Sequence, residues 1–379
     1  MIINFITDKN DKNLLKGCEK LYDGFAIRYK SGNYEKNIVH YLEYKCPPAN
    51  INIFYGYINN LLIDYSQNNI FVFDKIHYVQ SWTPQLHNYD LILVQNEDDL
   101  IIDSFVKKET KKETINMNMD AKDVNVFYKS IIQVCKKMKT IKLPQINNFM
   151  DPEELPNISL CMPTYNRKKF MKLVEMNYNN TTYPKDKIEF IILDDGTDKV
   201  EDVVPKGDNI KYYHYKKKET IGWKRNECVR LATNNIIAFM DDDDYYHPDS
   251  LINRVGHLMK SGRDCVFCST IGCFHIKKYS SIINVTPIEY PLEKKVSEAT
   301  LTFKKSFWHN HKFNNEDKIN EGEAFIKNAV NKCKEINWEG VIVQLLHTYN
   351  TCNKNLKIDE ENGSHFGFTN EEFEIITDI

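Results

Sequence analysis

The run Ile236–Met240, five apolar residues followed at once by Asp241–Asp244, constrains this chain most. A run without polar residues on either face is typical of a strand buried on both sides, as in a parallel sheet. Four adjacent carboxylates raise one another's pKa values unless a cation lies among them. Open α/β sheets bind ligands beyond the carboxyl ends of their strands. The stretch therefore predicts a hard divalent cation held by one or two carboxylates and by ligand phosphates, with a solvated acidic turn as the alternative.

Strand-like and helix-like segments alternate before this run, and each strand-like segment ends in polar or acidic residues. This order predicts a doubly wound sheet whose strand ends meet at one crevice. The expected strands are Ile158–Met162, Ile188–Leu193, Ile210–Tyr215 and Ile236–Met240, and the expected helices are Lys169–Tyr178 and Gly222–Thr233.

The first part of the chain shows the same alternation without any cluster of catalytic residues, which predicts a smaller α/β domain over residues 1–145. We expect it to bind the acceptor or to make oligomer contacts, with a homodimer as one option. Prolines and weak periodicity predict a linker at 146–156, and residues 157–379 form the second domain. The expected N-terminal elements are strands Ile2–Ile6, Ile51–Tyr57, Ile70–Phe73 and Leu91–Val94 and helices Asp11–Tyr22 and Val124–Met138.

Composition narrows the class of protein. The net charge of −3 gives no reason to expect nucleic-acid binding. No apolar run reaches the ~18 residues of a membrane span, and the N-terminus lacks the features of a signal peptide. Ten scattered cysteines are typical of reduced thiols, so we expect a soluble cytoplasmic protein. The Lys-, Asn- and Ile-rich composition suggests an AT-rich genome; if the source is a large virus, the cytoplasm is that of the host.

Five motifs give the second domain its resemblance to a known family. In order, they are Pro163-Thr-Tyr-Asn166, Asp194-Asp-Gly-Thr197, Gly222-Trp-Lys-Arg-Asn226, Asp241-x-Asp243-Asp244 and Glu321-Gly-Glu323. From Ile158 to about Leu251, and more weakly to Asn350, the chain resembles family 2 glycosyltransferases of the GT-A fold. The resemblance implies an α/β fold with a GT-A, Rossmann-like nucleotide-sugar-binding domain beside the smaller N-terminal α/β domain.

The donor site follows from the resemblance and from the chemistry of each side chain. Backbone near Thr164 can approach a flat base, Asp194 or Asp195 can accept from a base N–H or a ribose hydroxyl, and Lys224 and Arg225 can neutralise a diphosphate. Each also has a structural alternative as a turn, cap or solvated residue. The expected nucleotide-sugar-binding residues are Pro163, Thr164, Tyr165, Asn166, Arg167, Asp194, Asp195, Lys224, Arg225, Asp241, which by resemblance touches the ribose, and Asp242, which sits at a variable motif position.

The resemblance also implies a metal cofactor, Mn²⁺ or Mg²⁺, which would act as a Lewis acid on the leaving diphosphate. Asp243 is the implied ligand that lets the ion bridge both phosphates. His347 follows an apolar segment, and enzymes of this fold often place a C-terminal histidine on the metal. An imidazole suits Mn²⁺ better than Mg²⁺. A structural histidine is the alternative.

The acceptor side is less constrained. The family has a Glu-Asp pair opening a helix, and this chain has Glu321-Gly-Glu323, which lacks the Asp. Either glutamate could take the acceptor's proton, and Glu323 is preferred; a charged helix N-terminus is the alternative. Trp308 is expected to meet the acceptor sugar or to pack in the core.

These inferences predict an inverting, metal-dependent hexosyl- or N-acetylhexosaminyltransferase. It would move a sugar from a nucleotide sugar, most simply a UDP-sugar, to a hydroxyl group on a glycan or protein. One alternative is a pyrophosphorylase-like nucleotidyltransferase, although its glycine-rich N-terminal G-x-R signature is absent. The other is a non-catalytic nucleotide-sugar-binding or scaffold protein, which the missing Asp keeps open.

Overall fold

The computed structural model describes residues 2–7, 21–22, 25–31, 38–40, 49–55, 66–72, 86, 89–94, 114–116, 134, 150, 152–284, 286, 290–350 and 363–379. The chain divides into two compact units. The first comprises residues 1–36, 45–146 and 287–291, and the second comprises 37–44, 147–286 and 292–379. The chain therefore passes from one unit to the other more than once along its length.

The first unit holds a seven-stranded sheet of order β2-β3-β1-β5-β6-β7-β8. Neighbouring strands are parallel except for β2 and β3. The expected strands are confirmed, but Leu21–Tyr22 form β2 and not the end of a helix. The rest of that predicted helix, and Val124–Met138 apart from the helical Val134, lie outside the described residues. The strands are β1 (Ile2–Thr7), β2 (Leu21–Tyr22), β3 (Phe25–Ser31), β5 (Ala49–Tyr55), β6 (Ser66–Val72), β7 (Leu91–Val94) and β8 (Thr114–Asn116).

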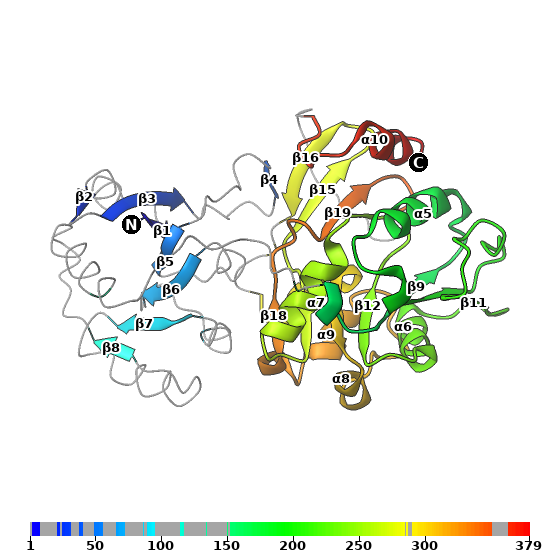
Figure 1. The fold of residues 1–379 in the computed structure, drawn as a ribbon, viewed down its shortest axis with the longest axis horizontal. Coiled ribbons are helices and arrows are strands. Elements are labelled where there is room, and N and C mark those ends of the chain that lie inside the picture. Colours follow the sequence, from blue (N-terminus) through cyan, green and yellow to red (C-terminus); the bar gives the residue numbers. More distant parts are fainter. Residues whose placement is uncertain are drawn as a thin grey trace. The chain divides into compact units, whose positions relative to one another are not determined.

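A second seven-stranded sheet forms the core of the second unit, with the order β11-β10-β9-β12-β17-β14-β18 (Figure 1). Strands β11, β10, β9 and β12 run parallel, whereas β17 is antiparallel to both of its neighbours. Every residue of β9, β10 and β12 is buried, as their largely apolar sequences predict, and the buried polar side chains Ser159 and Glu189 hydrogen-bond to each other. The strands are β9 (Ile158–Thr164), β10 (Ile188–Asp194), β11 (Ile210–His214), β12 (Ile236–Phe239), β14 (Cys265–Phe267), β17 (Thr302–Lys304) and β18 (Cys333–Glu335). The predicted α/β fold class is confirmed.

Helices join and flank these strands. Two of them, α5 and α6, occupy the predicted helical segments. Thr220 caps α6, because its hydroxyl accepts a hydrogen bond from the backbone N–H of Trp223. The helices are α5 (Met171–Asn180), α6 (Ile221–Leu231), α7 (Ser250–Lys260), α8 (Lys305–Asn310), α9 (Glu321–Ile326) and α10 (Asn370–Thr377), and the 3₁₀ turns include η5 (Lys168–Phe170) and η8 (Glu298–Thr300).

A five-stranded sheet, which the sequence analysis did not predict, completes the second unit in the order β13-β19-β15-β16-β4. Its strand β13 directly follows the acidic run, and β19 ends just before His347. The two strands are antiparallel, with Tyr245 opposite Val343 and Tyr246 opposite Ile342. This pairing brings the C-terminal histidine to the acidic run. The strands are β13 (Tyr245–Tyr246), β19 (Ile342–Leu346), β15 (Ile271–His275), β16 (Ser280–Asn284) and β4 (Ile38–His40).

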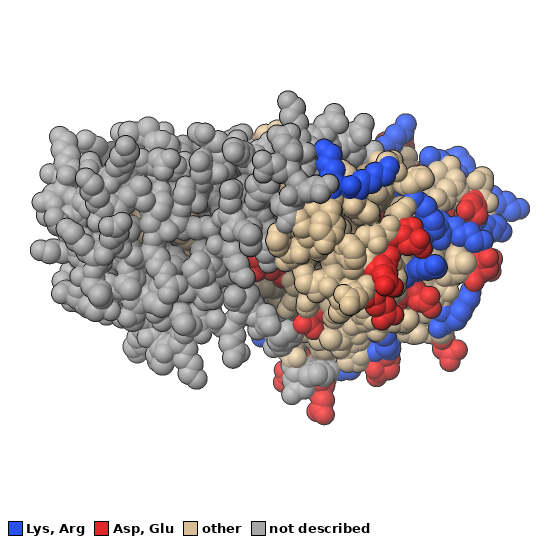
Figure 2. All heavy atoms as spheres, turned by 90° about the horizontal axis from the view of Figure 1, so that it is seen from above, with Lys and Arg blue, Asp and Glu red and all other residues tan. Residues whose placement is uncertain are grey.

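Among the described residues, no helix combines the length and apolarity needed to cross a membrane. On the face in Figure 2, acidic and basic side chains of the second unit lie among one another. The Cys-x-x-C pair Cys265 and Cys268 consists of two buried, free thiols.

Glu189 ties together three segments of the second unit. Its carboxylate accepts hydrogen bonds from Ser159 Oγ on β9 at 2.5 Å, from Lys211 Nζ on β11 at 2.5 Å and from the Thr233 N–H at 2.8 Å. Burial alone would raise the pKa of Glu189, but these hydrogen bonds outweigh burial and lower it. The charged carboxylate therefore contributes to the stability of the sheet.

We expect Glu189→Ala to lower the free energy of unfolding by about 2 kcal/mol at pH 7, because buried donors lose their acceptor. A depressed pKa means that this contribution is present above the unfolded-state pKa of about 4.3 and is lost as pH falls through the folded-state pKa. Urea denaturation at pH 7 and near pH 3 measures both. Lys211→Met, which removes a side chain that is 40% exposed, is the control and should cost less. A difference between Glu189→Ala and the wild type that is constant with pH would contradict this account.

Candidate functional site

The predicted site residues meet at the carboxyl edge of the parallel strands. Register places Asp194, the last residue of β10, beside Thr164, the last residue of β9. The backbone N–H of Met240, at the end of β12, donates to Cys161 O of β9 at 3.0 Å. The three loops that carry the polar motifs therefore leave the sheet side by side. Open α/β sheets bind their ligands at this edge.

The loops after β9 and β10 are locked together through Asn166, which has a left-handed φ of 52°. Its Oδ1 accepts from the Asp198 N–H at 3.0 Å and from Thr197 Oγ1 at 3.3 Å. A Cβ on Gly196 would lie 2.6 Å from Asn166 N, so only glycine fits there. Tyr165, in the same loop, is half-buried and has Lys218 Nζ 4.0 Å from its ring centroid.

Asp194 is fully buried and shapes its own loop. It accepts from Gly196 N–H at 2.8 Å, from Val200 N–H at 3.2 Å and from the Tyr212 hydroxyl at 2.7 Å. These contacts match the structural alternative, a turn aspartate, that the sequence left open for this residue.

Asp195 and Lys224 form a buried ion pair. Lys224 Nζ lies 2.9 Å from Asp195 Oδ1 and 3.3 Å from Thr164 O, and Asp195 Oδ2 accepts from Glu219 N–H at 2.7 Å. The side chains of the pair are 8% and 0% exposed. The sequence predicts that Asp195 and Lys224 each bind the nucleotide. In this structure, the charges of the two side chains neutralise each other.

Asp242, at the motif position that varies in the family, is held firmly. Its Oδ2 accepts from Thr164 Oγ1 at 2.5 Å, and Arg167 Nε lies 3.8 Å from its Oδ1. Burial, followed by the negative charge of Asp243, raises the pKa of Asp242 to about 8. Arg167 also lies 3.2 Å from Asp243 Oδ2 through Nη2 and donates to Tyr349 O at 2.9 Å through Nη1. Its guanidinium therefore offsets the charge of both carboxylates.

The two predicted metal ligands come close together, with His347 Nε2 at 3.6 Å from Asp243 Oδ2. One cation with bonds of about 2.1 Å can bridge atoms at this separation. In this conformation His347 Nδ1 accepts the Tyr349 N–H at 3.1 Å, and Nε2 lies 3.3 Å from Asn350 Nδ2. Coordination of a neutral ring through Nε2 requires its proton to be on Nδ1, so the hydrogen bond from Tyr349 would have to break. Within the described ranges, no group of three or more His, Cys, Asp or Glu could hold a metal.

The last aspartate of the run has a structural position. Asp244 is buried, and its Oδ1 accepts from the Leu345 N–H of β19 at 3.1 Å. This bond fastens the acidic run to the five-stranded sheet and thereby fixes the approach of His347.

Arg225, on α6, links the acidic run to α9. Its Nη2 lies 3.2 Å from Asp241 Oδ1, and its Nε donates to Glu321 Oε1 at 2.5 Å. Burial would lower the pKa of Arg225, but the charges of Asp241 and Glu321 outweigh burial and raise it. Burial raises the pKa of Asp241 despite the neighbouring arginine. Arg225 Nη1 is buried and has no hydrogen-bond partner in the described part of the chain.

The residues predicted for the acceptor side lie in different environments. Glu321 is 4% exposed and bonded to Arg225, whereas Glu323 is half-buried two residues further along α9. Trp308 lies in the hydrophobic core with its Nε1 donating to Asn226 Oδ1 at 2.8 Å. This is the packing role that the sequence left open beside an acceptor role.

Sequence reasoning missed Glu298, in η8, whose Oε1 accepts from the Gly322 N–H at 3.0 Å. Burial and the charge of Glu321 raise the pKa of Glu298 to about 7. No motif surrounds this residue, so only the three-dimensional arrangement reveals it.

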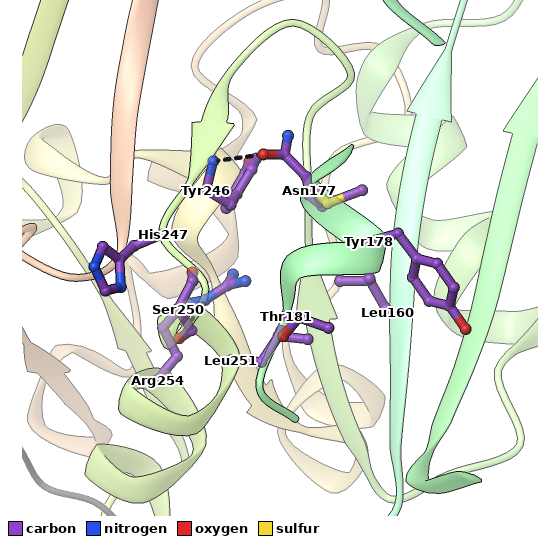
Figure 3. A pocket seen from close by; sticks show the side chains of 10 residues that line it. Leu160, Asn177, Tyr178, Thr181, Tyr246, His247, Ser250, Leu251 and Arg254 are labelled. Carbon is purple, nitrogen blue, oxygen red and sulfur yellow. Dashed lines mark hydrogen bonds between the residues drawn. The ribbon is translucent and has the colours of Figure 1, made fainter. Parts of the chain in front are cut away.

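A separate small pocket lies between α5, β9 and α7 (Figure 3). Asn177 Oδ1 accepts there from the Tyr246 N–H at 3.0 Å, and Arg254 donates from Nη1 to Phe239 O at 2.7 Å. None of the predicted site residues lines this pocket, which is a packing feature behind the acidic run.

We expect Lys224→Met to lower the free energy of unfolding by about 3 kcal/mol, because it leaves the buried Asp195 carboxylate without its partner. Lys218→Met, which removes an exposed ammonium group stacked on Tyr165, is the matched control and should cost less than about 1 kcal/mol. Urea denaturation of both variants at pH 7 measures the difference. Wild-type stability of Lys224→Met would show that the buried ion pair is absent in solution.

The chain was compared with protein families and known proteins. Residues 159–303 match the family model for glycosyl transferase family 2. An uncharacterized glycosyltransferase of Haemophilus influenzae is 27% identical over 128 residues, 31% of this chain and 50% of that protein. A putative glycosyltransferase, EpsH of Bacillus subtilis, is 31% identical over 101 residues, 25% of this chain and 28% of that protein. The match thus spans half or less of either relative.

Two solved structures resemble the chain at low identity. One is a mannosyltransferase from Pyrobaculum calidifontis in complex with GDP-Man and Mn²⁺, with 18% identity, a TM-score of 0.41, and coverage of 59% of this chain and 65% of that one. The other is S. aureus TarS 1–349 in complex with UDP-GlcNAc, with 16% identity, a TM-score of 0.40, and coverage of 50% and 59%. The family match includes four of the five motifs identified in the sequence and the central parallel strands. Over residues 159–303 the chain is therefore similar to glycosyl transferase family 2, which confirms the predicted resemblance.

Proposed function

We propose that this protein is a glycosyltransferase that moves a sugar from a nucleotide sugar, most simply a UDP-sugar, to a hydroxyl group. The observation that carries the proposal is the convergence of the family 2 motifs at one sheet edge. Arg167 and Arg225 both reach the acidic run there, one over Asp242 and Asp243 and the other beside Asp241. Guanidinium groups can bind a diphosphate, and carboxylates at the same sheet edge can bind a divalent cation that accompanies it.

The nucleotide would lie over the loops after β9 and β10. Half-buried Tyr165 offers a ring face, and Gly196 lets the loop after β10 approach the backbone of Asn166 closely. Asp194 and Asp195 support this surface from below through their buried hydrogen bonds, and the same bonds keep the loops in place. Hydroxyl and N–H groups of a nucleoside would then meet a rigid rim.

Asp243 and His347 are the residues that would hold a Mn²⁺ or Mg²⁺ ion, which stabilises the departing diphosphate when bound. The carboxylate and the imidazole suit Mn²⁺, and phosphate oxygens would complete the coordination. Arg167 now contacts Asp243, so the ion would displace this guanidinium. The freed Arg167 remains next to the diphosphate and can pair with it bidentately.

Inversion needs one in-line displacement, with a base on the acceptor side and the diphosphate leaving on the other side. Carboxylates Glu321, Glu323 and Glu298 lie at or beside the start of α9. One of them would take the acceptor's proton, a contribution of about 10²- to 10⁴-fold in rate. Residues 1–145 are proposed to supply acceptor or oligomer contacts.

The metal site is tested by calorimetry of UDP binding with and without Mn²⁺. We expect Asp243→Ala to remove the Mn²⁺-dependent part of the affinity, and His347→Ala to weaken it. If both side chains hold one ion, the double variant should lose no more than the larger single loss, because the two effects share a partner. Asp202→Ala, which removes an exposed carboxylate paired with Lys168, is the control. Unchanged Mn²⁺-dependent affinity in Asp243→Ala would overturn the assignment.

The activity is tested with a panel of UDP- and GDP-sugars, following release of the nucleoside diphosphate with and without hydroxyl acceptors. We expect one UDP-sugar to turn over in a Mn²⁺-dependent way. The same donor at 100 times its Kd should stabilise the fold by about 2.7 kcal/mol in thermal unfolding. Binding without turnover across the panel would favour a nucleotide-sugar-binding protein, which the glycine at the family's aspartate position would then explain.

A further inference from the structure

Gly322 occupies the position where the resembled family has its aspartate, but the space for a side chain there is already filled. A Cβ at Gly322 would lie 2.6 Å from Val296 Cγ1 and 2.9 Å from Glu298 Oε1. The carboxylate of Glu298 thus lies where the first atoms of a residue-322 side chain would be. A carboxylate is therefore present at this place, and η8 supplies it.

Hydrogen bonds hold both the side chain of Glu298 and the turn that carries it. Its Oε1 accepts from the Gly322 N–H at 3.0 Å. Its own turn, η8, is closed by the bond from Thr300 N–H to Ser297 O at 3.0 Å and anchored by the bond from Ser297 N–H to Cys268 O at 2.9 Å. A carboxylate fixed in this way is oriented before any ligand binds, as a catalytic group needs to be.

The turn that carries Glu298 is bonded to the start of the acidic run. The Leu301 carbonyl accepts from the Phe239 N–H at 2.9 Å, and the Ala299 carbonyl accepts from the Tyr246 hydroxyl at 3.2 Å. That hydroxyl in turn accepts from the Asp241 N–H at 2.8 Å. Two hydrogen bonds therefore connect the residue after Glu298 with the first aspartate of the predicted donor site.

The charged groups that face Glu298 are Glu321 and Arg225, with Asp241 on the far side of the arginine. Burial and the charge of Glu321 raise the pKa of Glu298 to about 7, against the opposing effects of Arg225 and of backbone N–H groups. A carboxylate with a pKa near the working pH is well matched to accepting a proton. Glu321 is less suited, because its side chain is 5% exposed and bonded to Arg225 at 2.5 Å.

We propose that Glu298 is the general base of the transfer, in the place that the missing aspartate leaves. This inference rests on the proposed function. Glu298 would accept the proton of the acceptor hydroxyl as its oxygen forms the bond to the anomeric carbon. The bond from that carbon to the diphosphate breaks in the same step, and its electron pair leaves on the diphosphate oxygen. Glu321 would position Arg225 and Glu298 without touching the acceptor.

The test compares Glu298→Gln with Glu323→Gln, the residue that sequence alone favours. We expect Glu298→Gln to lower kcat by about 10²- to 10⁴-fold while the Kd for the donor, measured by calorimetry, stays within about threefold. Glu323→Gln should lower kcat much less than Glu298→Gln does. Thermal unfolding checks that both variants fold, and in Glu298→Ala added formate should restore part of the rate by acting as a base.

The pH profile gives a readout that a purely structural role would not produce. A base works when deprotonated, so wild-type kcat/KM should rise with pH through about 7 and then level off, and Glu298→Gln should lose this limb. Near-wild-type kcat in Glu298→Gln, a large loss in Glu323→Gln, or weakened donor binding in Glu298→Gln would each overturn the assignment and leave the proposed function standing. Absence of transfer by the wild type with every donor would instead overturn the proposed function and, with it, this inference.

Discussion

The carboxylates at the end of β12 stay packed together because two guanidinium groups lie among them. Arg225 is shared by Asp241 and Glu321, and Arg167 is shared by Asp242 and Asp243. Desolvated carboxylates without such partners would take up protons, and even here the pKa values of Asp241 and Asp242 are raised. Helix α6 and the loop after β9 therefore bring their arginines to the same acidic run.

Much of this arrangement could be predicted from local sequence. Largely apolar runs indicated β9, β10 and β12, because a strand buried on both faces is mostly apolar. The polar exceptions inside these strands, Ser159 and Glu189, are buried and bonded to each other. Polar motifs directly after those runs had to lie at the same sheet edge. The resemblance to family 2 followed from the order of the motifs, since each one alone would have been weak.

The rest depended on pairings between distant segments. Nothing in the sequence near Lys224 shows that its ammonium is paired with Asp195, or that Glu321 belongs to Arg225, because these partners lie 29 and 96 residues apart. Strand β13 has two residues, too few to show a period, so its pairing with β19 was not foreseen. Glu298 could be recognised only from its contact with the Gly322 N–H, 24 residues away.

The double attachment of Arg167 has a kinetic consequence. One end of its guanidinium contacts Asp243 and the other donates to Tyr349 O, so it bridges the loop after β9 and the loop after β19. A cation held by Asp243 Oδ2 and His347, as we propose, would displace Arg167 from that oxygen, so the bridge would open before the cation binds. Opening is a unimolecular event, and the observed association rate would then stop rising with ligand concentration once opening becomes slower than encounter.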